Sequence, residues 1–124
     1  MHMLLSIYPE KKISEVQKEF SAEFPFLKLE FFKNGMTRKE SYPAHLQIPQ
    51  SKMIQEAWNL KRGEGNMEIQ EEMTVADLEN LFMDRYNLSV QVFRRSGNIW
   101  LETTMTDNWT LRQQNEHGKE ISET

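Results

Sequence analysis

The hydrophobic positions follow the same pattern twice along the chain. Apolar residues at steps of three and four predict one helix in each half, because that spacing forms a single stripe on a helix. The stripes are Ile13, Val16, Phe20 and Phe24 in the first half, and Val75, Leu78, Phe82 and Tyr86 in the second. Short apolar segments precede the helices at 5–7 and 67–69, and alternating runs that predict strands follow at 27–32 and 88–93. Each half is therefore predicted to be strand, helix, strand, and the copies match at an offset of 62 that falls to 61 after Phe26.

Two tandem units of this kind predict an α+β fold, a two-layer ferredoxin-like sandwich with an antiparallel sheet and both helices on one face. Ser96-Gly97 is interpreted as a two-residue turn that returns an extra edge strand over 99–104. In that register Phe93 faces Trp100 and Gln91 faces Glu102. A β-grasp arrangement around the second helix is the alternative.

Copy one also carries a turn signal, Asn34-Gly35. A return strand after it would set Arg38 opposite Phe31 on the core face, so we expect this hairpin to be frayed, short or bulged.

Capping signals place the helix starts. Thr74 with Asp77 and Thr110 with Gln113 are typical capping boxes, whereas the first helix and a short connector helix are expected to start near Ser14 and Ser51. We expect a single domain over 1–118, with a C-terminal helix at 110–117 ended by Gly118 and a disordered tail at 119–124. Within it, copy one covers about 3–35, the connector 36–64 and copy two about 65–104.

Composition narrows the protein class. The 124 residues include no cysteine, which excludes disulfides, thiolate metal sites and cysteine nucleophiles, and a cytoplasmic location is expected. No segment is apolar over a membrane-spanning length. Residues 1–62 carry ten Lys or Arg against seven Asp or Glu (net +3), and residues 63–124 carry five against twelve (net −7). This asymmetry favours head-to-tail association of copies or reflects drift on solvated faces.

The second half resembles a known family. The segments 74–79 (TVADLE), 91–104 (QVFRRSGNIWLETT), 106–111 (TDNWTL) and Gln114-Asn115 are similar to those of small bacterial proteins of unknown function. The resemblance covers the second half well and the first half loosely. It implies a bacterial cytoplasmic protein and brings no activity, cofactor or site residue with it.

The histidines, glycines and carboxylates of the sequence form no pattern that predicts catalysis or a cofactor. His2, His45 and His117 have no ligand partner at metal-binding spacing, and Gly63-Glu64-Gly65 lacks the remainder of a phosphate-binding loop. Glu71-Glu72 precedes a helix, where negative charge offsets the helix dipole. We therefore expect no metal, no cofactor and no enzyme, although a site absent from the sequence pattern stays an alternative.

The functional hypothesis concerns the face of the predicted sheet that the two helices do not cover. It is expected to present aromatic residues, and an exposed aromatic cluster is usually covered by something. We consider three coverings: the chain itself, through the connector with Tyr42 and Trp58 or the tail with Trp109; a protein partner or a second copy; and single-stranded RNA, which the negative net charge disfavours. We therefore expect a non-enzymatic protein-interaction or self-assembly module that binds a protein partner or a second copy through this aromatic face or through the edge strand 99–104. The candidate interaction surface comprises Phe32, Gln91, Phe93, Trp100, Glu102 and Trp109.

Overall fold

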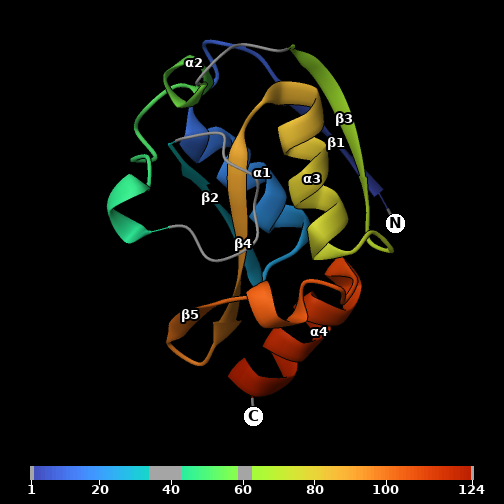
Figure 1. Ribbon diagram of the computed structural model, residues 1–124. Helices are drawn as coiled ribbons and strands as arrows, with labels where there is room; N and C mark the ends of the chain where they lie inside the picture. The colour runs from blue at the N-terminus through green and yellow to red at the C-terminus, as the bar shows by residue number, and fades with distance from the viewer. Residues whose placement is uncertain (1, 34–42, 59–62, 124) are drawn as a thin grey trace.

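The computed structural model describes residues 2–33, 43–58 and 63–123, and within them the strand–helix–strand order occurs twice (Figure 1). Copy one contains β1 (His2–Ile7), α1 (Ile13–Glu23) and β2 (Leu27–Phe32). Copy two contains β3 (Gly65–Gln70), α3 (Val75–Tyr86), β4 (Ser89–Ser96) and the extra strand β5 (Ile99–Glu102). Copy one is followed by the short segments η1 (Ala44–Leu46) and α2 (Ile54–Ala57). Copy two is followed by the short η2 (Thr104–Thr106) and by α4 (Leu111–Ser122), which is as long as α3.

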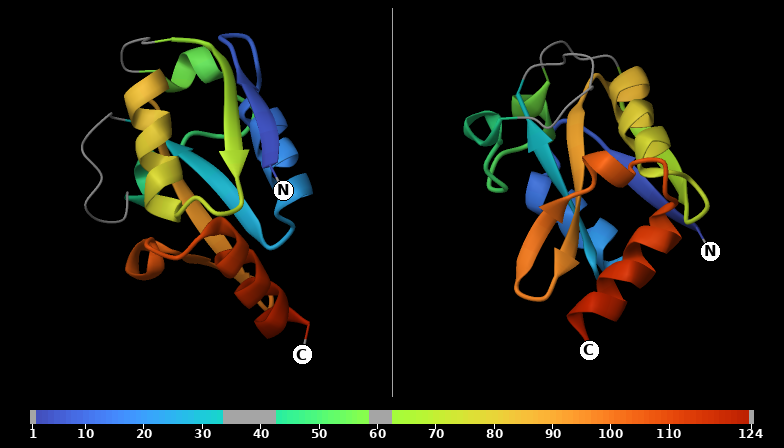
Figure 2. Two further views of the ribbon diagram at one scale, coloured as in Figure 1. Left: turned by 90° about the vertical axis from the view of Figure 1, so that its right-hand side faces the viewer. Right: turned by 60° about the horizontal axis from the view of Figure 1, so that its bottom comes forward.

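The α+β prediction is confirmed, and the architecture is compatible with a two-layer sandwich. The ferredoxin-like order fits only roughly: the described strands form two antiparallel sheets, β1–β3 and β2–β4–β5, whereas the sequence pattern predicts a single sheet. Among the described strands, every pair except the β4–β5 hairpin joins copy one to copy two. In the left view of Figure 2 the β1–β3 pair lies in front of β2 and β4, with α3 to the left and α1 to the right.

A single core fills the space between these elements. It takes Leu5 and Ile7 from β1, Phe20 from α1, and alternate positions of β2, β3 and β4. Phe31 of β2 meets Phe82 of α3 edge to face, with ring centroids 5.9 Å apart. Full burial of each such side chain contributes about 1.5–3 kcal/mol, so the copies stabilise one another mainly through this shared core.

The helix starts follow the capping chemistry. Thr74 and Thr110 cap α3 and α4 as expected, with Oγ1 accepting from the amides of Asp77 and Gln113. The expected start at Ser14 is wrong: α1 begins at Ile13, after Lys12. A lysine offers no acceptor, so the Lys12 amide instead donates to a Glu15 carboxylate oxygen at 3.1 Å.

The connector helix α2 also starts later than expected. Its N-cap is Met53 rather than Ser51, and the Met53 amide donates to the Glu56 carboxylate at 2.9 Å. The Asn34-Gly35 turn, Arg38 and Tyr42 lie outside the described residues.

Each copy is longer than the sequence indicated. The first amide of α1, on Ile13, donates to the Lys52 carbonyl, and the first amide of α2, on Ile54, donates to the Lys11 carbonyl. Copy two repeats this reciprocal arrangement between α3 and α4, where Val75 donates to Trp109 and Leu111 donates to Met73. The part of the connector that holds α2 is therefore the counterpart of the start of α4, at an offset of 57.

The predictions of a helix at 110–117 and a disordered tail at 119–124 are wrong, because α4 continues to Ser122. Gly118 lies inside the helix and is buried. A Cβ at this position would lie 2.9 Å from Phe26 Cβ and 3.1 Å from Arg94 Cγ. The glycine therefore allows α4 to approach β4 closely and does not end the helix.

Candidate interaction surface

The β4–β5 hairpin turns one residue later than predicted. Gly97 and Asn98 form the turn, Gly97 has a φ of 64°, and Ser96 pairs with Ile99. Glycine at the first turn position suits a type II′ hairpin. The predicted facing of Phe93 with Trp100 is therefore wrong.

The observed pairs are Phe93 with Glu102 and Arg95 with Trp100. The shift equals two residues, so each side chain stays on its predicted face. Phe93 and Trp100 are diagonal neighbours on the outer face of the sheet.

Lys28 of β2 lies against this aromatic pair. Its ammonium is 5.0 Å from the Trp100 ring centroid and 5.7 Å from that of Phe93, and it also pairs with the Glu30 carboxylate at 3.3 Å. A cation over an aromatic face is attracted by the ring quadrupole. The chain thus partly covers its own aromatic pair, although Trp100 stays 37% exposed.

Phe32 and Gln91 lie on the same outer face but are buried. The connector runs along this end of β2: Ile48 donates to the Phe31 carbonyl at 2.8 Å, and Gln47 pairs with Phe32. Phe32 and Gln91 are therefore not available at the surface. Trp58, one of the connector residues considered as a cover for the aromatic face, packs against the core.

Trp109 belongs to a different part of the molecule. Its ring lies 5.7 Å from the Arg94 guanidinium and 5.5 Å from the His117 ring, beside α4. Arg94 pairs with Leu27 and Leu101, so it lies on the face opposite to Phe93 and Trp100. The structure therefore does not bring Trp109 together with the other candidate residues.

Polar contacts of Gln114 and Asn115 hold α4 in place. Gln114 is fully buried; its amide oxygen accepts from Arg94 at 2.7 Å and its Nε2 donates to the Thr106 carbonyl at 2.8 Å. The Asn115 side chain accepts from the Phe26 amide at 2.8 Å. Burial lowers the pKa of the Arg94 guanidinium. These polar residues dock a helix onto the hairpin.

The other edge of this sheet is blocked by side chains. Ser21 and Gln17 of α1 donate to the Leu27 and Leu29 carbonyls of β2, at 2.8 and 2.7 Å. Such blocking protects a strand from pairing with another chain.

Side chains also cover the backbone of the part of β4 that β5 does not reach. Thr103 donates to the Val92 carbonyl at 2.8 Å, and the Val92 amide donates to the Glu79 carboxylate at 3.0 Å. Gln17 and Glu79 are counterparts in the two copies, so the same helix position shields a strand in each.

β5 is different, because all four of its residues are exposed. Ile99, Trp100 and Leu101 are 58%, 37% and 39% exposed. In the part of the chain that the structure describes, β5 pairs with β4 and with no second strand. From the sequence, Trp100 and Glu102 are predicted individually as surface residues, whereas Ile99 and Leu101 are included only as part of the edge strand 99–104. Because successive side chains of a strand point to opposite faces, three consecutive apolar residues place apolar side chains on both faces of β5.

Beside Trp100, an open groove of about 440 Å³ runs between α1 and β2. It is lined by Ser14, Gln17, Lys18, Ser21, Lys28, Glu30, Gln50 and Trp100. Among the described residues that line it, the one carboxylate is that of Glu30, which accepts from Gln17 at 2.9 Å and pairs with Lys28. Among the described residues, no group of three His, Cys, Asp or Glu side chains could hold a metal ion.

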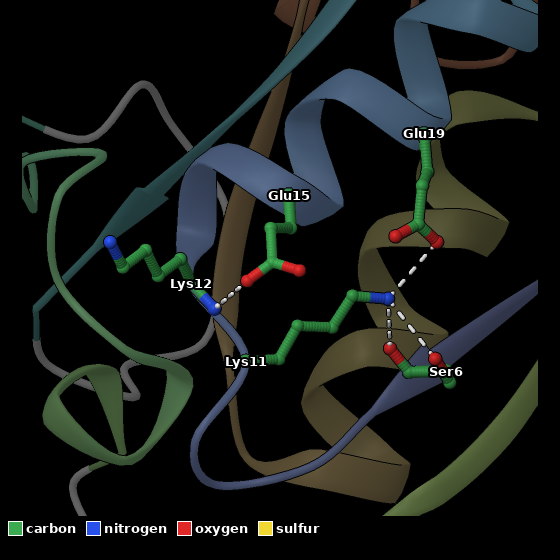
Figure 3. Close-up of polar contacts among 5 residues, drawn as sticks. All are labelled: Ser6, Lys11, Lys12, Glu15 and Glu19. Carbon is green, nitrogen blue, oxygen red and sulfur yellow. Dashed lines mark hydrogen bonds and ion pairs between the residues drawn. The ribbon is translucent and has the colours of Figure 1, made fainter.

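A buried lysine forms a second polar cluster (Figure 3). Lys11 is 2% exposed, and its ammonium donates to the Ser6 carbonyl at 2.8 Å, the Ser6 hydroxyl at 3.1 Å and the Glu19 carboxylate at 3.0 Å. Three acceptors satisfy the three donors of an ammonium. The cluster therefore joins β1 to α1 and has no donor left for a ligand.

No described helix is long and apolar enough to cross a membrane. Comparison with protein-family models, with curated proteins and with solved structures finds no match for the chain.

Proposed function

We propose that this protein is a non-enzymatic self-assembly module of the cytoplasm that forms a twofold dimer by pairing β5 with β5 of a second copy. The observation that carries this proposal is the exposed apolar strand at the edge of a sheet whose opposite edge is blocked by side chains. An apolar edge strand of this kind is a template for pairing with another chain.

The backbone of β5 defines the register of this dimer. The pair that flanks a two-residue turn is hydrogen-bonded, and such pairs alternate along a hairpin. Ile99 and Leu101 therefore direct their backbone groups toward β4, and Trp100 directs its amide and carbonyl away from it. A second β5 that pairs with these groups places Trp100 opposite Trp100 of the second copy.

The side chains of β5 are complementary to themselves in this register. Leu101 faces Ile99 of the second copy on one side of the sheet, and the two Trp100 side chains adjoin on the other. Glu102 faces Asn98 of the second copy, so no like charges are opposed. A self-complementary patch of this kind is what a twofold interface requires, and it favours a second copy over an unrelated partner.

Sedimentation velocity over a concentration series tests the proposal with a matched pair of variants. Trp100→Lys sets two ammonium groups directly opposite each other and should shift the protein to a monomer. Asn98→Lys adds the same charge two residues away, opposite Glu102 of the second copy, and should keep or strengthen the dimer. A wild type that stays monomeric at all concentrations, or equal behaviour of the two variants, contradicts the proposal. A stable complex with another protein that only Trp100→Lys abolishes would replace the second copy as the occupant of β5.

A further inference from the structure

The two copies form each sheet around a common centre. At the offset of 62, the counterpart of Leu5 is Met67, and these residues pair with each other in β1–β3. At the offset of 61, the counterpart of Glu30 is Gln91, and they pair in β2–β4. Pairs on either side of each centre are reciprocal: Leu29 pairs with Val92 and Phe31 with Val90 in the second sheet. These are the registers of a symmetric dimer.

The pairing also shows that neither copy is complete alone. No described strand of copy one pairs with another strand of copy one, and β3 and β4 of copy two each require a partner from copy one. The reciprocal caps between α1 and α2, and between α3 and α4, stay within a copy. Each copy is thus a locally organised unit that leaves the edges of its two main strands open for the other.

We infer that a second copy of this chain can replace either half, so that the described residues of the first half of one chain (2–33 and 43–58) pack on those of the second half of another (63–123). The exchanged dimer keeps the described contacts between the halves, because both halves are present in both chains; the two forms differ in which chain supplies each half. Exchange of identical elements is a low-cost route to a dimer. The inference does not rest on pairing through β5.

Charge selects which halves combine. Residues 1–62 carry a net charge of +3 and residues 63–124 a net charge of −7. In the packing between halves, replacement of the basic first half by another acidic second half is opposed by repulsion, whereas the first half of one chain attracts the second half of another. The charge asymmetry therefore favours the same combination of halves that a single chain makes.

Concentration decides between the closed and the exchanged form. A short linker holds two modules at an effective concentration on the order of 1 mM. Exchange therefore becomes appreciable when the protein folds from the unfolded state at about this concentration, and it is negligible near about 1 μM.

A pair of introduced cysteines distinguishes the two forms, because the natural chain has none. Leu4 pairs with Glu68 across β1–β3, and both side chains are exposed. Directly opposed residues of antiparallel strands are close enough for a disulfide. The variant with Leu4→Cys and Glu68→Cys is unfolded, refolded at about 1 μM or about 1 mM, oxidised, and analysed by non-reducing denaturing electrophoresis.

We expect an internally crosslinked monomer after dilute refolding and a covalent dimer as a substantial fraction after concentrated refolding. The His2→Cys and Gln70→Cys pair, at an exposed position of the same sheet, provides a second test if the first variant does not fold. A control pair within copy two, Ser96→Cys and Ile99→Cys, should give a monomer at both concentrations.

Complete oxidation to a monomer at about 1 mM in the cross-sheet variants overturns the inference. A dimer through β5 separates into monomers on this gel, so failure of the exchange and failure of the β5 interface give different results.

Discussion

The buried Lys11 provides a quantitative test of how far the two copies are interchangeable. The counterpart of Lys11 in copy two is Met73, and the counterpart of Glu19 is Leu81. Both copy-two side chains are partly buried against the core. The equivalent positions therefore hold an ion pair in one copy and two apolar side chains in the other, and these apolar residues can be transferred as Lys11→Met with Glu19→Leu.

The structure sets the expected magnitudes. Loss of one partner of a buried ion pair costs about 3–5 kcal/mol. The Glu19 side chain is 44% exposed and Lys11 keeps two Ser6 acceptors, so Glu19→Leu alone should destabilise by about 1–2 kcal/mol. Apolar replacement of a whole buried pair is neutral or stabilising by about 1–4 kcal/mol. Subtracting about 1 kcal/mol because the Ser6 acceptors lose the Lys11 donor, we expect the double variant to equal or exceed the wild type in stability.

Urea unfolding of the wild type, both single variants and the double variant measures these differences in a double-mutant cycle. Glu15→Leu is the control, since Glu15 caps the Lys12 amide without contacting Lys11 in this cluster (Figure 3), and its effect should add to that of Lys11→Met. A double variant no more stable than Glu19→Leu would show that the copies do not share an interchangeable site.

Two further predictions concern the docking of α4. Gly118→Ala gains about 1 kcal/mol of helix propensity but forces contacts on Phe26 and Arg94 that cost about 1–3 kcal/mol, so urea unfolding should show a net loss, and a net gain would contradict the tight helix–strand contact. Gln114→Ala removes the acceptor of the Arg94 guanidinium and should destabilise by about 1–3 kcal/mol, with loss of near-ultraviolet circular dichroism from Trp109; an effect under about 0.5 kcal/mol would mean that solvent replaces these bonds.

The local elements could be predicted from the sequence because their signals are local. The apolar stripes identify α1 and α3, and the side chains of Thr74 and Thr110 are direct capping partners. The turn at Gly97 could be placed only to within one residue, since glycine suits either central position of a two-residue hairpin. That ambiguity misplaced Trp100 by two residues along β4 but kept it on the correct face.

The remaining features depend on contacts between distant segments. Phe32 is buried because residues 46–48 return beside β2. Gly118 stands inside a helix because β4 lies too close to α4 for a larger side chain. The pairing of β1 with β3 depends on how the copies face each other, which no local pattern encodes. The exposed surface was accordingly predicted only in part: Trp100 and Glu102 lie on it, whereas Gln91 is buried and Trp109 lies elsewhere.

Amide hydrogen exchange of the wild-type protein, measured residue by residue over a range of concentrations, tests pairing through β5 most directly. The Leu101 amide, which points to β4, should be protected at every concentration. The Trp100 amide, which points away from β4, should become protected as the concentration rises and the second copy binds. A Trp100 exchange rate that does not change with concentration would contradict the β5 dimer.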